Sequence, residues 1–126
     1  MARKDEKIEH LKQVRLFSQC TKKELDHIAR ISDETTATAG SILTEEGTRG
    51  LEFFLILNGE ASVKKNGRRV ATLSKGAYFG ELSLLDQWPR SATVVAQTDM
   101  ELLVVHRRDF TALIHDVPGL AYKLLV

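Results

Sequence analysis

The sequence of 126 residues has little of several things that mark particular protein classes. A single cysteine, Cys20, excludes an internal disulfide, and no apolar run approaches the roughly 20 residues that span a bilayer. The net charge is only +1, since 18 Lys and Arg face 17 Asp and Glu, so no overall field attracts nucleic acid or membranes. The N-terminus is charged and lacks the apolar core of a signal peptide. These absences predict a cytoplasmic protein that neither binds nucleic acid nor inserts into a membrane.

Catalytic and metal-binding motifs are also scarce. No two of the four histidines have the spacing of a helical metal site, and Cys20 has no nearby ligand partner. A Ser-His-Asp triad assembles in space without a fixed motif, but no nucleophile elbow supports one. We therefore expect no catalytic residues, no metal site and no cofactor, and we predict that the protein is not an enzyme.

Length and composition are typical of one soluble domain. Apolar residues make up 43% and charged residues 28%, and a chain of this size buries enough surface for its own core. The patterning predicts N-terminal helices over residues 1–32, a β-barrel over 33–107 and C-terminal helices over 108–126.

Helical signals lie at both ends. Ile8 and Leu11 belong to an amphipathic pattern, and Thr21 with Glu24 forms a capping box, which satisfies the first free N–H groups of a helix. The predicted helices cover residues 2–16, about 22–30 and 109–114, with a further one starting at Leu120.

The middle of the chain reads as short strands separated by turns. Asn58-Gly59 and Asn66-Gly67 are strong hairpin-turn dipeptides, and the apolar run 51–57 indicates a strand that is buried on both faces or lies at the closure of the barrel. The predicted strands cover residues 35–38, 41–44, 51–57, 61–64, 68–73, 91–97 and 100–106. Seven or eight short strands at this spacing predict a mostly β fold, a sandwich or a jelly-roll barrel, with flanking helices.

The stretch 76–96 carries the chemistry. Gly80 lets backbone N–H groups approach a ligand closely, and the residues after it suit a helical turn whose N-terminus attracts an anion. Arg90 can neutralise a phosphodiester through two parallel hydrogen bonds. Ser91 and Thr93 add hydroxyl donors, and the small side chain of Ala92 takes up little space on the strand. Together these residues indicate a phosphate site.

Glu81 is unexpected beside an anion, because like charges repel. It makes sense if its carboxylate accepts a hydrogen bond from a hydroxyl next to the phosphate, such as a ribose 2′-OH. The residues alone therefore suggest a phosphate with an adjacent sugar, although other ligands would satisfy the same groups.

Residues 79–85 (Phe-Gly-Glu-Leu-Ser-Leu-Leu) and 89–94 (Pro-Arg-Ser-Ala-Thr-Val) resemble the phosphate-binding cassette of cyclic nucleotide-binding domains. The likeness extends more loosely from Leu16 to about Leu113. It implies an eight-stranded jelly-roll barrel with flanking helices and a short cassette helix.

The resemblance also implies roles for individual residues. Glu81 would take the ribose 2′-OH and Arg90 the cyclic phosphate. Other predicted contacts come from the cassette and from two barrel positions that would pack the base: Phe79, Gly80, Leu82, Ser83, Ser91, Ala92, Thr93, Val63 and Val70.

Base preference depends on the residue after the arginine. A Thr there leans toward cGMP in this family, whereas Ser91 within Pro-Arg-Ser-Ala-Thr resembles bacterial cAMP-binding members. We predict cAMP as the ligand, with cGMP as the alternative.

The predicted function is that of a regulatory sensor whose partners are a cyclic nucleotide and a second copy or an effector domain. Family members usually continue into a long lid helix, and some into a helix-turn-helix; this sequence ends at Val126, so the lid is expected to be truncated or absent. The alternative is a degenerate barrel that binds no nucleotide and serves in protein interaction or dimerisation. Its contacts would come from the first helix and the run 120–126.

Overall fold

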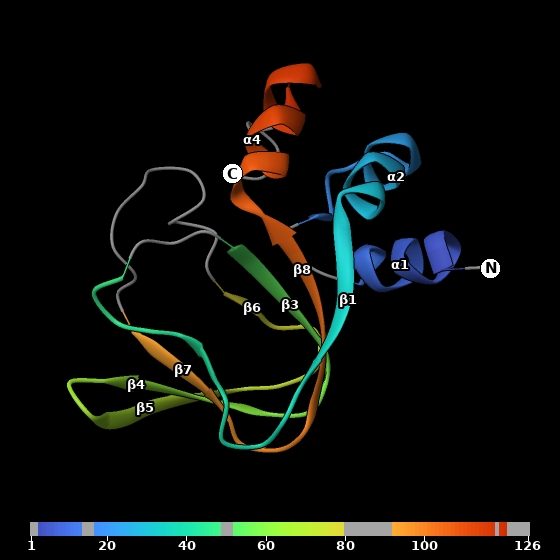
Figure 1. The fold of residues 1–126 in the computed structure, drawn as a ribbon. Helices are drawn as coiled ribbons and strands as arrows, with labels where there is room; N and C mark the ends of the chain where they lie inside the picture. The colour runs from blue at the N-terminus through green and yellow to red at the C-terminus, as the bar shows by residue number, and fades with distance from the viewer. Residues whose placement is uncertain (1–2, 14–16, 49–51, 80–91, 118, 121–126) are drawn as a thin grey trace.

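The computed structural model describes residues 3–13, 17–48, 52–79, 92–117 and 119–120. Its elements are drawn in Figure 1. The helices are α1 (Arg3–Lys12), α2 (Lys22–Arg30) and α4 (Arg107–Asp116). The strands are β1 (Ser32–Ala37), β2 (Ile42–Thr44), β3 (Glu52–Asn58), β4 (Ala61–Lys65), β5 (Arg68–Leu73), β6 (Tyr78–Phe79), β7 (Thr93–Ala96) and β8 (Met100–His106).

These strands form two antiparallel sheets. The first sheet has the order β1-β8-β3-β6, and the second has the order β2-β7-β4-β5. Apart from the consecutive strands β4 and β5, neighbours in each sheet come from distant parts of the sequence, and the chain passes repeatedly from one sheet to the other (Figure 1). The prediction of a mostly β, jelly-roll fold with flanking helices is confirmed.

The helices pack beside the first sheet. The capping box of α2 is formed, since Thr21 Oγ1 accepts from the Glu24 N–H at 3.2 Å and Glu24 Oε1 accepts from the Thr21 N–H at 2.8 Å. Helix α1 is shorter than predicted, and its Lys7 Nζ donates to the carbonyl oxygen of Ala29 at 3.3 Å at the end of α2. Within the described residues, none of the helices has both the length and the apolar character needed to cross a bilayer.

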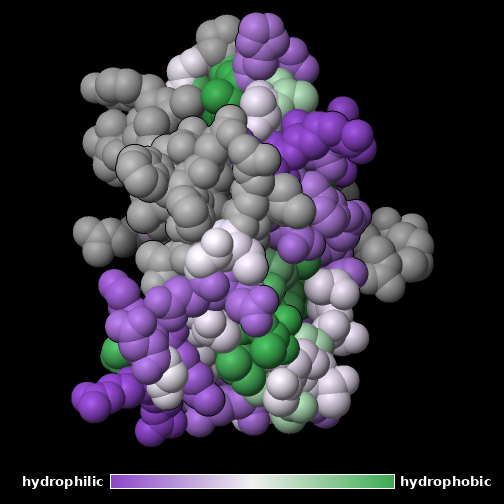
Figure 2. Space-filling model, turned by 60° about the vertical axis from the view of Figure 1, so that its left-hand side comes forward, coloured by the Kyte–Doolittle hydropathy of each residue, from purple (hydrophilic) through white to green (hydrophobic). Residues whose placement is uncertain are grey.

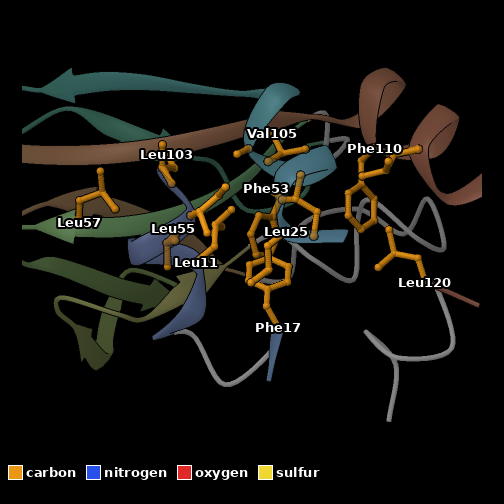
Figure 3. Packing of buried hydrophobic residues seen from close by; sticks show 14 residues of the cluster. Leu11, Phe17, Leu25, Phe53, Leu55, Leu57, Leu103, Val105, Phe110 and Leu120 are labelled. Carbon is orange, nitrogen blue, oxygen red and sulfur yellow. The ribbon is translucent and has the colours of Figure 1, made fainter. Parts of the chain in front are cut away.

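The strand β3 is buried on both faces, as its apolar run predicted. Phe53, Leu55 and Leu57 pack into a cluster with α1, α2 and α4, which we call the helix-side core (Figure 3). Phe54 and Ile56 point the other way, into a cluster between the two sheets, which we call the inter-sheet core. Because successive side chains of a strand alternate between faces, one apolar strand serves both cores.

The two Asn-Gly turns have different outcomes. Asn66 and Gly67 both have positive φ, at 53° and 79°, and join β4 to β5 as the predicted hairpin. The prediction of a hairpin at Asn58-Gly59 is wrong, because β3 and β4 belong to different sheets. Gly59 has φ +93°, and a Cβ there would lie 2.5 Å from the Asp99 carbonyl oxygen, so this turn needs a glycine for a close crossing between sheets.

Candidate ligand site

The predicted cassette lies between β6 and β7. Strand β6 ends at Phe79 in the first sheet, and β7 begins at Thr93 in the second. The segment between them therefore connects the two sheets. Several predicted site residues, and the expected cassette helix, lie outside the residues that the structure describes: Gly80, Glu81, Leu82, Ser83, Arg90 and Ser91.

On the first sheet, aromatic packing fixes the start of this connection. Phe79 is 8% exposed, and its ring stacks on Phe54 of β3 with centroids 4.8 Å apart. Tyr78 stacks on Phe53 at 5.8 Å on the opposite face of the sheet. The aromatic pair before Gly80 thus reaches both cores, and the ring of Phe79 belongs to the packing between the sheets.

On the second sheet, hydrogen bonds fix the end of the connection. Thr93 Oγ1 accepts from the backbone N–H of Glu46 at 2.9 Å, and Thr44 Oγ1 donates to the Ala92 carbonyl oxygen at 3.4 Å. The Thr93 hydroxyl keeps one proton that it can donate. Sequence reasoning missed Thr44 and Glu46, because they are 48 and 47 residues away from their partners in the chain, respectively.

The two predicted base-packing valines lie on the neighbouring strands β4 and β5. Val63 is half-buried against the inter-sheet core and lies opposite Val94 of β7. Val63 also pairs with Ala71, whereas Lys64 pairs with Arg69, so Val70 is the extra residue of a β-bulge. Val70 is 61% exposed. Bulges often redirect a side chain beside a binding site, and here one leaves an apolar side chain uncovered.

Thr93 is the first residue of β7 after the cassette and lies beside β4, the strand that carries Val63. It lies opposite Lys64 of β4, one position beyond the pair formed by Val63 and Val94. The structure therefore brings Ala92 and Thr93 to the same end of the second sheet as Val63. The described residues contain no group of three or more His, Cys, Asp or Glu that could hold a metal ion.

A surface hollow of about 520 Å³ lies elsewhere, where β3 ends and β8 begins. Its lining includes Asn58, Asp99 and Glu101, and Asn58 Nδ2 donates to Glu101 Oε1 at 3.0 Å. None of its lining residues belongs to the predicted ligand site.

Residues 34–116 match the family model described as cyclic nucleotide-binding domain. The chain is 40% identical over 105 residues to the cAMP-dependent protein kinase regulatory subunit of Schizosaccharomyces pombe. This alignment covers 82% of the chain and 26% of that protein, so the chain spans about a quarter of its length.

Two solved structures have the same fold. The regulatory domain of Toxoplasma gondii PKA, crystallised with cAMP, superposes with a TM-score of 0.82 at 27% identity over 96% of this chain and 49% of that one. The regulatory subunit of a cAMP-independent protein kinase A from Trypanosoma brucei also gives 0.82, at 25% identity over 91% of this chain and 44% of that one.

These relatives are eukaryotic, so the narrower prediction of a bacterial-type domain is not supported. The family itself is clear, because its model matches well over half of the chain and the observed barrel is that of the solved members. The protein belongs to the cyclic nucleotide-binding domain family.

Proposed function

We propose that this domain is a sensor that binds cAMP in preference to cGMP and has no catalytic activity. The observation that carries the proposal is that the two ends of the 79–94 motif lie in different sheets. Its last residues lie beside half-buried Val63 of β4, and the neighbouring strand β5 carries an exposed apolar residue, Val70. A nucleotide needs an anion site at one end and an apolar surface for its base at the other. The sequence motif supplies the anion site, and Val63 of β4 with Val70 of β5 supplies the apolar surface for the base.

Each predicted residue then has a distinct task. Arg90 pairs with the cyclic phosphate, and the carboxylate of Glu81 accepts a hydrogen bond from the ribose 2′-OH. Backbone groups of the cassette from Gly80 to Ser83, with Ser91 and Ala92, complete the phosphate site. Thr93 donates its hydroxyl proton nearby, and Phe79 contributes through its backbone because its ring lies in the core.

Signalling requires that the nucleotide bind two states of the protein with different affinities. Helix α4 is well placed to respond, because it follows β8 directly and buries Phe110 and Leu113 in the helix-side core (Figure 3). We infer that filling the cassette repositions α4 and, through it, an effector domain or a second copy. The ligand itself would remain unchanged.

Isothermal titration calorimetry with cAMP and with cGMP tests the proposal. We expect tighter binding of cAMP, and Arg90→Ala should weaken it roughly tenfold to a hundredfold, because a charge-assisted hydrogen bond contributes about 1.5–3 kcal/mol. Arg108→Ala is a matched control, since Arg108 is exposed on α4 and should leave binding unchanged. An Arg90→Ala protein that binds as well as the parent would show that the phosphate assignment is wrong.

A second candidate is a barrel that binds no nucleotide and acts through protein contacts alone. It is favoured by the Trypanosoma brucei structure, which has the same fold and is described as cAMP-independent. The same titration decides between the two, because this candidate predicts no heat and no thermal shift with either nucleotide at millimolar concentration.

A further inference from the structure

The β4–β5 hairpin concentrates positive charge. Lys64, Lys65, Arg68 and Arg69 fall within six consecutive residues, although the chain as a whole has a net charge of only +1. The remainder of the chain, with fourteen Lys and Arg against seventeen Asp and Glu, has a net charge of −3. In the space-filling view, hydrophilic residues gather at the lower left of the molecule, next to a hydrophobic patch (Figure 2).

The register of the hairpin places like charges directly opposite each other. Lys64 pairs with Arg69, and Lys65 pairs with Arg68. Like charges at such positions destabilise a strand pair. Among the residues described, no ion pair involves any of these four side chains. The carboxylate at the turn, Glu46, uses Oε1 to accept the Asn66 N–H at 3.1 Å. The hairpin therefore carries a repulsion that an anionic partner would relieve.

Strand β5 also offers main-chain hydrogen-bonding groups. It is the last strand of the second sheet, and in the described part of the chain it pairs only with β4. Every residue from Arg68 to Thr72 is exposed. An edge of this kind can accept an additional strand from another protein. Positive side chains on an edge also discourage self-association, which is the competing explanation for the same residues.

We propose that the edge of β5 binds an extended acidic segment of a protein partner, which adds a strand to the second sheet. Successive side chains of the added strand point to opposite faces, as those of Arg68 and Arg69 do. Two adjacent acidic residues would thus meet one arginine on each face, with Lys64 and Lys65 on the neighbouring strand. A bilayer can cover only one face, and the Asn66-Gly67 tip has no apolar side chain to insert or aromatic ring to stack on bases.

Fluorescence anisotropy of the full chain with a labelled peptide tests this proposal. The probe is a Glu-Glu pair flanked on each side by Thr-Val-Thr. We expect the double variant R68E/R69E to lower its affinity by at least about tenfold, because opposite charges at the interface become like charges. The control K22E/K23E makes the same change of net charge at exposed positions of α2, and its affinity should stay within about twofold of the parent.

A second probe separates strand addition from simple charge attraction. The same peptide with alternate backbone nitrogens methylated keeps its charge but cannot complete a β-ladder, so we expect it to lose binding. R68E/R69E should still fold, with a melting temperature no lower than that of the parent, because its cross-strand pairs become oppositely charged.

Four results would overturn the proposal. The first is binding of the methylated peptide as tight as that of the unmethylated one, and the second is unchanged affinity in R68E/R69E. The third is tighter binding to phosphatidylserine vesicles or to a DNA oligonucleotide than to the peptide. The fourth is no peptide binding at all, which would leave protection of the sheet edge as the role of the four cations.

Discussion

The two sheets of the barrel differ in what covers them. The first sheet is buried on both faces at β3 and β8, whose alternating side chains enter the helix-side core and the inter-sheet core. The second sheet turns Ala61, Val94 and Ala96 toward the inter-sheet core, but its edge strand β5 is almost wholly exposed. Among the described residues, the large exposed apolar side chains are those of Val70 and Ile42, 61% and 59% exposed, and both lie in the second sheet.

This difference separates stability from recognition. Burying apolar side chains on both faces gives the first sheet a large share of the hydrophobic free energy. The second sheet has exposed apolar and charged side chains. Substituting them should cost little stability, and a ligand or a partner can cover them. Four substitutions test this separation, and the largest effects are expected in the core.

The most severe loss is expected from Ile56→Ala. Ile56 is 0% exposed between the sheets, and removing its side chain should cost about 2–5 kcal/mol of the free energy of unfolding, through lost burial and a remaining cavity. Val70→Ala in the second sheet should change stability by no more than about 0.5 kcal/mol. Urea denaturation followed by circular dichroism measures both. Comparable losses in the two variants would remove the distinction between the sheets.

Gly59→Ala tests the crossing from the first sheet to the second. An added Cβ would meet the Asp99 carbonyl oxygen at 2.5 Å, and the residue has φ +93°, so we expect a loss of about 2–3 kcal/mol. Gly67→Ala is the matched control, because its φ is +79° with no atom within 4 Å of the added Cβ, and it should cost about 1 kcal/mol. Equal losses on urea denaturation would mean that strain alone, without the close contact, determines the effect.

Thr93→Val tests how the second sheet holds the end of the cassette. The substitution keeps the branched shape but removes the acceptor for the Glu46 N–H, so we expect a stability loss of about 1 kcal/mol. The variant should also bind cAMP more weakly, because β7 begins at this residue. Calorimetric titration beside a urea curve measures both effects, and full affinity with normal stability would show that this anchor is dispensable.

The smallest expected effect is a gain in the free energy of unfolding. Arg69→Glu turns the like-charged pair with Lys64 into an opposite pair, and we expect it to add about 0.2–1 kcal/mol to the free energy of unfolding. The gain should disappear near 1 M salt, where screening acts within about 3 Å. Lys23→Glu, an exposed change of the same charge on α2, is the control. A loss of stability in Arg69→Glu would show that the hairpin carries no such repulsion.

Local sequence patterns predicted the bounds of helices and strands better than they predicted which strands pair with each other. Strands 68–73 and 100–106 have the predicted bounds, and the capping box marked α2 correctly. Asn58-Gly59 does not form the predicted hairpin, because the dipeptide indicates only a local turn, while the partners of β3 are β6 and β8. Strand β6 has two residues, too few for any periodic pattern.

The motif predicts a ligand site, and the surroundings of that site depend on contacts that no motif contains. Ala92 and Thr93, at the end of the cassette, lie at the same end of the second sheet as Val63. Residues 80–91 lie outside the described part of the chain, so the roles of the site residues stay predictions. The bulge at Val70 depends on the register between β4 and β5, and the bond from Glu46 to Thr93 depends on a contact across the barrel. Neither is encoded in a short stretch of sequence.

A titration with cAMP followed by backbone amide chemical shifts tests most directly whether the nucleotide lies against the second sheet. The amides of Val63, Val70 and Thr93 should shift on saturation, while those of Ile56 and Leu103, deep in the first sheet, should not. The same titration of Arg90→Ala should need roughly tenfold to a hundredfold more nucleotide. Shifts confined to the hollow at Asn58 and Glu101, or no shifts at millimolar cAMP, would contradict the proposed site.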